Sequence, residues 1–283
     1  MSGSRAPTAE TRVAGVIGDP VRHSRSPAIH NAAFAAAGLD WLFVAFEVPR
    51  GHGADAVAAM RALGIVGLSV TMPHKQDAAW GCDHLTPDAT VLGAVNTIVA
   101  AEHGVLGAST DGEGFLRSVR DHDVDPAAGP ALVLGAGGAA RAIALALAGA
   151  GADVTVAARR RDAAEAVAGL ATGADAVLLA ECDPGGYALV VNATPLGMKG
   201  EAPAVDPERL NPGQFVVDTV YHPMETPLLA AARARGVPCA NGLGMLVHQA
   251  ALAFELWTGT DAPLEAMRAA AAADPPDGKD PRA

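Results

Sequence analysis

The sequence predicts an α/β protein with two successive α/β units, the second of which has a doubly wound parallel sheet. Apolar runs typical of strands alternate with helical patterns of ten or more residues, which favours parallel strands joined by right-handed crossovers. A glycine-rich turn joins a strand pattern to a helix pattern at residues 131–141. The chain has 283 residues, 50% of them hydrophobic, which is enough for substantial cores.

The first unit begins with alternating strand and helix patterns. The predicted strands lie at residues 13–18, 41–48 and 66–72, and a helix lies at 54–63. Another helix is expected to begin near Ser26 and Pro27, because serine is a good N-cap and proline a good first helical residue. Two short apolar runs flank a glycine within residues 96–109, which predicts a hairpin.

The second unit follows the Pro- and Gly-rich stretch at residues 125–130. A helix at residues 112–121 links the two units. The expected strands are 131–134, 154–158, 176–179, 188–191 and 215–220, with helices at 141–147, 162–170, 245–257 and 263–272. Residues 1–10 and 274–283 are polar or rich in Pro, Asp and Gly, and we expect them to be disordered.

Composition excludes several classes of function. A net charge of -11 and 4% aromatic residues argue against a nucleic-acid partner. Three distant cysteines, Cys82, Cys182 and Cys239, suggest neither a disulfide framework nor a metal site, and a reducing cytoplasm fits them best. No apolar stretch resembles a signal peptide or a membrane span. We therefore expect a cytoplasmic protein without a metal, a membrane partner or a nucleic-acid partner.

The glycine-rich turn is a candidate dinucleotide site of the Rossmann type. Gly135, Gly137 and Ala140 fit the pattern G-x-G-x-x-A, in which small residues let backbone N–H groups approach a pyrophosphate at a helix N-terminus. A chain rich in alanine and glycine can also produce this spacing in an ordinary packed turn. The context of the motif has to decide between the two.

The residues after the second strand of this unit indicate which dinucleotide would bind. An NAD site usually has Asp or Glu here, whereas this strand runs into Arg159, Arg160 and Arg161, about 20 residues past the glycines. Arginine is a planar, permanently charged donor that suits a phosphate. The sequence therefore predicts NADP, the alternative being a solvated start of a helix.

Two further loops place reactive side chains at the ends of strands. Lys75 follows the strand at residues 66–72, and Asp111 follows the hairpin. Taken alone, Lys75 is better interpreted as a surface lysine and Asp111 as a helix cap, so neither residue indicates catalysis by itself.

Seven motifs together make the sequence resemble the shikimate dehydrogenase family. They occur in family order between residues 13 and 257. They are residues 18–27, 69–75, 93–97, 110–112, 135–139, 192–198 and 241–250.

The resemblance implies roles for individual residues. Lys75 and Asp111 match the family's catalytic pair, in which one side chain exchanges a proton with the reacting oxygen. The substrate-binding residues would be Ser24, Ser26, Thr71, Lys75, Asn96, Asp111, Tyr221 and Gln249. The cofactor-binding residues would be Gly135, Ala136, Gly137, Gly138, Ala139, Arg159, Arg160, Asn192, Thr194, Gly242 and Met245. Ser26 could also only cap its helix, and Asn192 could only form an Asx turn.

The implied protein is an NADP-dependent enzyme of the shikimate pathway, and hence of chorismate and aromatic amino acid biosynthesis. It would reversibly reduce 3-dehydroshikimate to shikimate as a monomer or homodimer. Residues 1–111 and 246–283 would form the substrate domain and residues 112–245 the NADP-binding Rossmann domain. Two alternatives stay open: a quinate/shikimate or aminoshikimate dehydrogenase that accepts NAD, and a non-catalytic paralogue that senses quinate and a nucleotide.

Three positions depart from the usual family pattern. Ser69 and Ser109 stand where the family often has asparagine, and Ala158 precedes Arg159 where asparagine is common. The shorter side chains leave more room near the ring hydroxyls. They keep the choice between shikimate, quinate and an amino analogue open.

Overall fold

The computed structural model describes residues 6–273 and divides into two compact units. The units comprise residues 1–84, 95–107 and 250–283, and residues 85–94 and 108–249. Of the termini predicted to be disordered, residues 1–5 and 274–283 lie outside the described residues, and residues 6–10 form an exposed turn.

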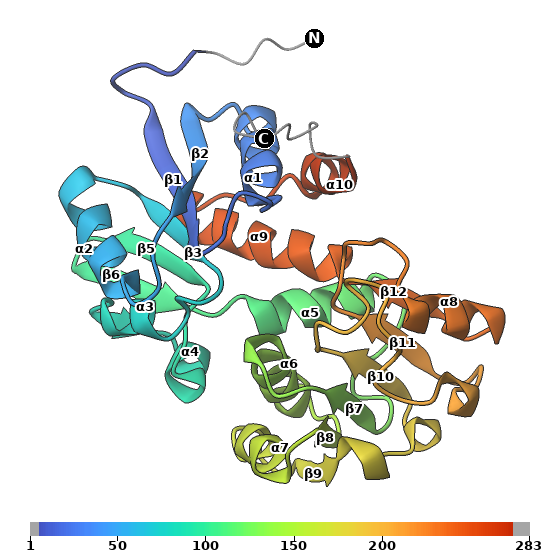
Figure 1. The fold of residues 1–283 in the computed structure, drawn as a ribbon. Helices are drawn as coiled ribbons and strands as arrows, with labels where there is room; N and C mark the ends of the chain where they lie inside the picture. The colour runs from blue at the N-terminus through green and yellow to red at the C-terminus, as the bar shows by residue number, and fades with distance from the viewer. Residues whose placement is uncertain (1–5, 274–283) are drawn as a thin grey trace. The chain divides into compact units, whose positions relative to one another are not determined.

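The first unit is built on a six-stranded sheet with the order β2-β1-β3-β5-β6-β4 (Figure 1). β1 pairs in parallel with both β2 and β3, and β3 pairs antiparallel with β5. The strands are β1 (Arg12–Gly18), β2 (Trp41–Glu47), β3 (Gly67–Val70), β4 (His84–Leu85), β5 (Thr97–Ala101) and β6 (Gly104–Ala108). The predicted hairpin at residues 96–109 is therefore confirmed.

Helices from both ends of the chain pack in the first unit. They are α1 (Ser26–Ala36), α2 (Gly53–Leu63), α3 (Asp77–Trp80), the second half of α9 (Leu243–Thr258) and α10 (Leu264–Ala272). Phe34 of α1, Phe43 of β2 and Trp257 of α9 form an aromatic core around the ring of His30. The few aromatic residues of the chain are thus concentrated in this unit.

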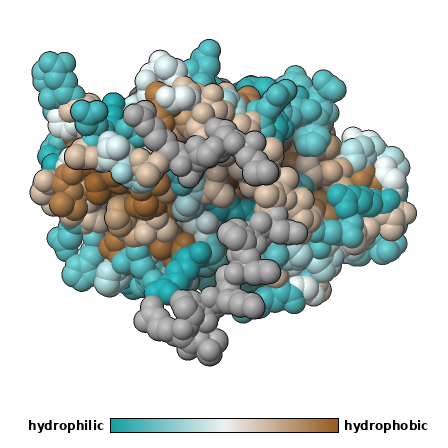
Figure 2. Space-filling view, turned by 90° about the horizontal axis from the view of Figure 1, so that it is seen from above, coloured by the Kyte–Doolittle hydropathy of each residue, from teal (hydrophilic) through white to brown (hydrophobic). Residues whose placement is uncertain are grey.

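Some large hydrophobic side chains of the first unit remain exposed. Leu63, Met72 and Trp80 are each more than 70% exposed. In the view from above, hydrophobic side chains gather on the left of the visible face and are interrupted by hydrophilic ones (Figure 2). Single exposed apolar side chains of this kind are common on protein surfaces.

The second unit has a six-stranded parallel sheet with the order β12-β11-β10-β7-β8-β9. The strands are β7 (Ala131–Leu134), β8 (Val154–Ala158), β9 (Asp175–Leu178), β10 (Leu189–Asn192), β11 (Phe215–Asp218) and β12 (Cys239–Asn241). Strand order runs in one direction from β7 to β9 and in the other from β10 to β12. This confirms the predicted doubly wound sheet and places its switch point between β7 and β10.

Both faces of this sheet are covered, as a buried parallel sheet requires. One face packs on α5 (Asp111–Arg120), α6 (Gly138–Gly149) and α7 (Arg161–Ala168), and the other on α8 (Pro227–Ala234). Neighbouring residues of β7 alternate between the two cores, since Val133 faces the first and Leu132 the second. The unit also includes α4 (Pro87–Leu92), whose last carbonyl, that of Leu92, accepts a hydrogen bond from Arg141.

Close helix packing in the second unit depends on small residues. A Cβ atom at Gly112 would lie 2.8 Å from both the carbonyl oxygen and a methyl group of α6. Alanine-rich α6 and Gly112 of α5 therefore let these two helices approach each other.

Candidate active site

In the first unit, two loops meet at the carboxyl ends of β1 and β3. The backbone N–H of Asp19 donates to the carbonyl of Met72 over 3.1 Å. A Cβ at Gly18 would lie 2.6 Å from the Thr71 methyl group, so the loops touch at this glycine. The turn that carries Ser24 and the turn that carries Lys75 thus start from one edge of the sheet.

The two predicted carboxylate-binding serines lie in the turn that starts α1. The Ser24 hydroxyl oxygen accepts a hydrogen bond from the Ser26 N–H over 3.2 Å. The prediction that Ser26 caps this helix is wrong, because Arg25 is the N-cap residue and Ser26 is the first helical residue. No side-chain hydrogen bond caps the start of α1. Ser26 is largely buried, but its hydroxyl is not used in capping.

Backbone hydrogen bonds bring Lys75 and Asn96 to the same edge. The Lys75 carbonyl accepts from Val95 N–H, and the Asn96 carbonyl accepts from Val70 N–H, both over 2.7 Å. Asn96 is buried, and its side-chain oxygen accepts from the Thr97 hydroxyl over 3.1 Å. Lys75 is half-buried, as is Thr71. Five of the predicted substrate residues, Ser24, Ser26, Thr71, Lys75 and Asn96, therefore lie on loops at one edge of the first sheet.

His74 supports the turn that carries Lys75, a role that the sequence did not signal. Its ring is fully buried, and Nε2 lies 2.7 Å from the Val48 carbonyl oxygen. Its Nδ1 lies 3.5 Å from the Asp77 carboxylate, which also accepts from Gly53 N–H. Only the tertiary contacts of His74 reveal this function, since a histidine beside a lysine has no characteristic pattern.

In the second unit, the glycine-rich turn lies at the switch point of the sheet. Gly135 has φ +122°, which favours glycine, and a Cβ there would lie 2.9 Å from the Ala193 carbonyl oxygen. Gly137 is the N-cap of α6 with an ordinary φ of -81°, and a Cβ there would contact nothing within 4 Å. The fold therefore explains the glycine at 135 but does not require one at 137. A dinucleotide pyrophosphate that approached the exposed backbone closely would require a glycine at position 137.

The three arginines after β8 have different surroundings. Arg160 forms an ion pair with Asp162 at 3.3 Å, and Arg161 forms one with Glu181 at 2.9 Å. Arg159 is exposed and has no ion pair or side-chain hydrogen bond within the part of the chain that the structure describes. Arg159 thus has the guanidinium that a phosphate could engage without first breaking an ion pair.

The side chain of Asn192 is engaged within the protein. Its amide nitrogen donates to Asp218 over 3.0 Å and to the Leu196 carbonyl over 3.2 Å. Its oxygen accepts from the N–H and the hydroxyl of Thr194, at 3.2 and 2.6 Å. The Asx turn therefore exists, and it shapes the loop beside Gly135. A ligand at this loop would meet its backbone more readily than the Asn192 amide.

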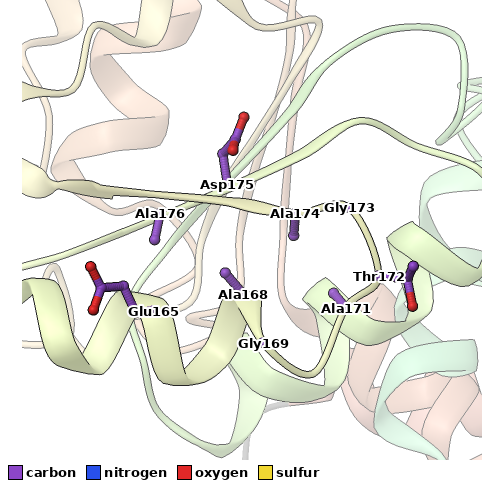
Figure 3. A pocket seen from close by; sticks show the side chains of 9 residues that line it. All are labelled: Glu165, Ala168, Gly169, Ala171, Thr172, Gly173, Ala174, Asp175 and Ala176. Atoms are coloured by element: carbon purple, nitrogen blue, oxygen red, sulfur yellow. The ribbon is translucent and has the colours of Figure 1, made fainter.

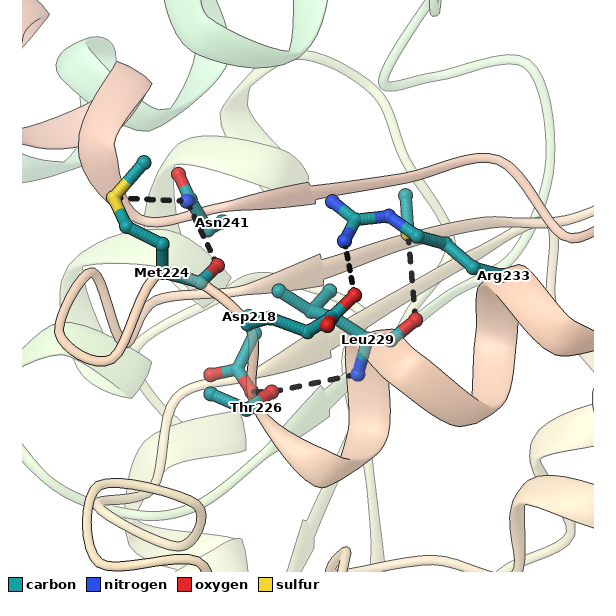
Figure 4. A network of polar contacts seen from close by, with 8 residues as sticks. Asp218, Met224, Thr226, Leu229, Arg233 and Asn241 are labelled. Atoms are coloured by element: carbon teal, nitrogen blue, oxygen red, sulfur yellow. Dashed lines mark hydrogen bonds and ion pairs between the residues drawn. The ribbon is translucent and has the colours of Figure 1, made fainter. Parts of the chain in front are cut away.

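Asp218 ends β11 and joins two of the loops at this edge (Figure 4). Besides Asn192, its carboxylate accepts from Val220 N–H over 3.1 Å and from the Thr226 hydroxyl over 2.6 Å. Burial raises the pKa of Asp218, while these hydrogen bonds act to lower it. The loop that holds Tyr221 is thereby tied at both ends to one carboxylate.

A third loop, between β12 and α9, packs on the same segment. A Cβ at Gly242 would overlap the carbonyl of Thr219. Next to it, Asn241 donates to the Met224 carbonyl over 3.1 Å, and Met245 is buried in the core of the unit. The loops that carry the predicted cofactor residues Asn192, Thr194, Gly242 and Met245 are therefore packed as one group with the Tyr221 loop.

Asp111 and Gln249 are neighbours within the second unit. Asp111 is the first residue of α5, and its N-cap Thr110 donates a hydroxyl hydrogen bond to the Gln249 carbonyl over 3.0 Å. A Cβ at Gly114 would lie 2.7 Å from the Gln249 backbone nitrogen. Asp111 is largely buried and Gln249 is half-buried. The crossing of α5 and α9 thus brings these two predicted substrate residues together.

A hollow elsewhere in the second unit has the wrong chemistry for a dinucleotide. It lies between α7 and the edge strand β9 and is lined mostly by small residues, with the carboxylate of Glu165 at one end and Asp175 on β9 pointing away from α7 (Figure 3). Carboxylates would repel a pyrophosphate. None of the predicted site residues lines it.

Within residues 6–273, no helix is long and apolar enough to cross a membrane. In the same range, no three His, Cys, Asp or Glu side chains are grouped as metal ligands.

Comparisons with known proteins identify the family of this chain. A family model described as the shikimate dehydrogenase substrate binding domain matches residues 16–98. A second model, described as the shikimate 5'-dehydrogenase C-terminal domain, matches residues 242–272. The two matches include Ser24, Lys75 and Gln249.

Individual relatives are similar over nearly the whole chain. A protein of Acidiphilium cryptum (strain JF-5) named shikimate dehydrogenase (NADP(+)) is 48% identical, over 93% of this chain and 96% of its own. The crystal structure of shikimate 5-dehydrogenase from Thermus thermophilus in complex with NADP(H) and shikimate has a TM-score of 0.86 at 38% identity, over 92% and 98% of the two chains. Quinate dehydrogenase from Corynebacterium glutamicum in complex with NAD has the same TM-score at 33% identity, over 92% and 98%. The chain therefore belongs to the shikimate dehydrogenase family.

Proposed function

We propose that this chain is an NADP-dependent oxidoreductase that reversibly reduces 3-dehydroshikimate to shikimate. The main support is the grouping of Ser24, Ser26, Thr71, Lys75 and Asn96 on loops at one edge of the first sheet. Relatives with 45–48% identity carry the name shikimate dehydrogenase (NADP(+)). We assign residues 1–111 and 246–283 to the substrate domain and residues 112–245 to the NADP domain, whereas the compact second unit also includes residues 85–94, 108–111 and 246–249. The enzyme acts in the cytoplasm as a monomer or homodimer, without nucleic acid or membrane partners.

The substrate is held by side chains. The hydroxyls of Ser24 and Ser26 bind its carboxylate at the start of α1, where N–H groups and the helix dipole favour an anion. Tyr221 lies beside that carboxylate. Thr71, Asn96 and Gln249 hydrogen-bond the ring hydroxyls. A ligand with a carboxylate and several ring hydroxyls therefore matches the donors and acceptors of these residues.

Proton transfer is the task of Lys75 and Asp111. NADP accepts or supplies the hydride when it is bound. Lys75 Nζ exchanges a proton with the oxygen of the reacting secondary alcohol. Asp111 accepts a hydrogen bond from that hydroxyl and orients it. The backbone turn anchored by Val95 and by His74 holds Lys75 in place.

The cofactor is held mainly by backbone. Gly135, Ala136, Gly137, Gly138 and Ala139 form the turn and the first residues of α6, whose N–H groups face the pyrophosphate. Arg159, with Arg160 beside it, binds the 2′-phosphate. Asn192 and Thr194, together with Gly242 and Met245, line the rest of the cofactor site.

Steady-state kinetics with two cofactors and two substrates test this function. We expect the rate of NADP+ reduction with shikimate to exceed the rates measured with NAD+ and shikimate, NADP+ and quinate, and NAD+ and quinate. Lys75→Ala should lower kcat by about 10²–10⁴, the usual contribution of a proton-transfer group. Lys199→Ala, which removes an exposed lysine, is the matched control and should retain full activity.

Each alternative predicts a different result. Faster turnover of quinate with NAD+ would identify a quinate/shikimate dehydrogenase, and a preference for an amino analogue would identify an aminoshikimate dehydrogenase. Binding of quinate and nucleotide in a calorimeter without turnover would identify a sensor. Unchanged kcat in Lys75→Ala would remove the proton-transfer pair from the mechanism.

A further inference from the structure

We propose that Arg25 is a positioning residue for the substrate carboxylate. Its side chain holds the C-terminal end of α10 and thereby fixes the turn that carries Ser24 and Ser26. This inference rests on the proposed function, in which these two hydroxyls bind the carboxylate.

The contacts of the Arg25 guanidinium identify what it holds. Nη1 donates to the carbonyl of Ala271 and, over 3.1 Å, to that of Ala273. Ala273 is the C-cap residue of α10, so these carbonyls lie at the end of the helix. Terminal carbonyls lack partners within the helix and carry the negative end of its dipole. A guanidinium is therefore a favourable partner for them.

The backbone of Arg25 links the same residue to both serines. Arg25 is the N-cap of α1, and its carbonyl accepts the first helical hydrogen bond, from Ile29 N–H over 3.1 Å. The bond from Ser26 N–H to the Ser24 hydroxyl spans it. A shift of Arg25 would therefore move both hydroxyls, while α1 packs along α10 in the same unit.

The contacts of Nη1 support this role. An arginine between two carboxylate-binding serines would be an obvious ligand for the anion. However, the two N–H groups of Nη1 are matched by two carbonyl acceptors on α10. Nε and Nη2 carry the other three N–H groups of the guanidinium, so the experiment below includes a measurement on α10 that separates the two roles.

Kinetics and hydrogen exchange of the full-length protein together test the proposal. In Arg25→Ala we expect KM for shikimate to rise about tenfold with kcat and KM for NADP+ nearly unchanged, because a carboxylate contact is made equally in the ground and transition states. Without ligands, exchange should accelerate in residues 264–273 and 24–30. Arg25→Lys should recover part of the KM, since an ammonium group can still donate to a carbonyl.

Arg22→Ala is the matched control. Arg22 lies in the same loop, is exposed, and pairs with Glu47 at 2.8 Å. This variant removes the same charge close to the serines and leaves the two Arg25 hydrogen bonds to α10 in place. Both its KM for shikimate and its exchange in residues 264–273 should equal those of the parent.

Two results would overturn the proposal. A raised KM in Arg25→Ala with unchanged exchange in residues 264–273 would mean that Arg25 binds the substrate directly. Faster exchange with an unchanged KM would mean that α10 does not position the serines. Failure of the proposed function is distinguishable, because the parent would then neither turn over nor bind shikimate. Hydrogen exchange in residues 264–273, compared between Arg25→Ala and Arg22→Ala, would still show whether Arg25 holds the end of α10.

Discussion

In the first unit the imidazole of His30 lies in an aromatic core, and neither ring nitrogen has a hydrogen-bond partner among the described residues. In the second unit the equally buried carboxylate of Asp218 accepts three hydrogen bonds. His30 therefore reduces the stability of its unit, whereas Asp218 organises the loops around it.

The same contrast holds at the two ligand-facing edges. In the first unit, backbone hydrogen bonds hold the loops of Lys75 and Asn96, and these loops carry several polar side chains. In the second unit, Asn192 and Thr226 use their side chains to bind Asp218, so the loops present backbone. A substrate chosen by the pattern of its hydroxyls needs side chains, whereas a pyrophosphate needs N–H groups. The difference therefore follows from the two ligands proposed.

Removal of the Asp218 carboxylate should have the largest effect. In Asp218→Ala, Asn192, Val220 and Thr226 lose their acceptor in a buried site, so we expect a loss of about 3–5 kcal/mol in the free energy of unfolding. The KM for NADP+ should rise as well, because two loops lose their common anchor. Urea unfolding and steady-state kinetics measure the two effects.

Two variants sharpen the result for Asp218. Asp218→Asn keeps one acceptor oxygen and should be intermediate in both measurements. Asp175→Ala removes an exposed carboxylate from the edge strand β9 and should change neither. If Asp218→Ala is less stable but keeps the parental KM for NADP+, the hydrogen bonds of Asp218 stabilise the fold and do not shape the cofactor site.

The effect of His30 should depend on pH. Burial lowers the pKa of His30 from 6.5 to about 3. Above pH 6.5 the ring is neutral in both the folded and the unfolded chain. Below pH 6.5 only the unfolded chain takes up the proton, so this residue makes stability fall by about 1.4 kcal/mol per pH unit until about pH 3. His30→Phe should flatten the fall, as measured by urea unfolding between pH 7 and 4.

An exposed histidine provides the control for His30. His103 lies at the exposed turn between β5 and β6, and His103→Phe should keep the parental dependence of stability on pH. If the free energy of unfolding falls equally with pH in His30→Phe and in the parent, His30 is not the group that makes the first unit sensitive to acid.

Much of the fold was predictable because buried parallel strands are short apolar runs between turn residues. The predicted strands at residues 131–134 and 154–158 agree with β7 and β8 in both bounds. By contrast, β12, α3 and α4 were not predicted, because three to six residues are too few for a period to be visible. The strand predicted at 66–72 ends at Val70, because Thr71 already begins the turn that leads to Lys75.

The sequence motifs predicted the loops of the candidate site but not their internal supports. Glycine spacing and strand ends single out Gly135 and Lys75 as candidates. His74 and Asp218 act through partners that are distant in sequence, such as Val48 and Thr226, and no local pattern announces such pairs. The capping role given to Ser26 failed because a cap depends on backbone angles, and Arg25 has the N-cap position.

The smallest effect is expected from Arg159. At the second edge, where the loops present backbone, Arg159 is proposed to bind the cofactor through its side chain. Its neighbours Arg160 and Arg161 are ion-paired, whereas Arg159 has no such partner among residues 6–273. A charge-assisted bond to the 2′-phosphate contributes about 1.5–3 kcal/mol, so Arg159→Ala should raise the KM for NADP+ roughly tenfold. The KM for NAD+, which lacks this phosphate, should stay the same. Arg161→Ala, which frees Glu181 and the Ala176 carbonyl, should change neither KM. Equal effects of Arg159→Ala on both cofactors would show that the second edge binds NADP through backbone alone.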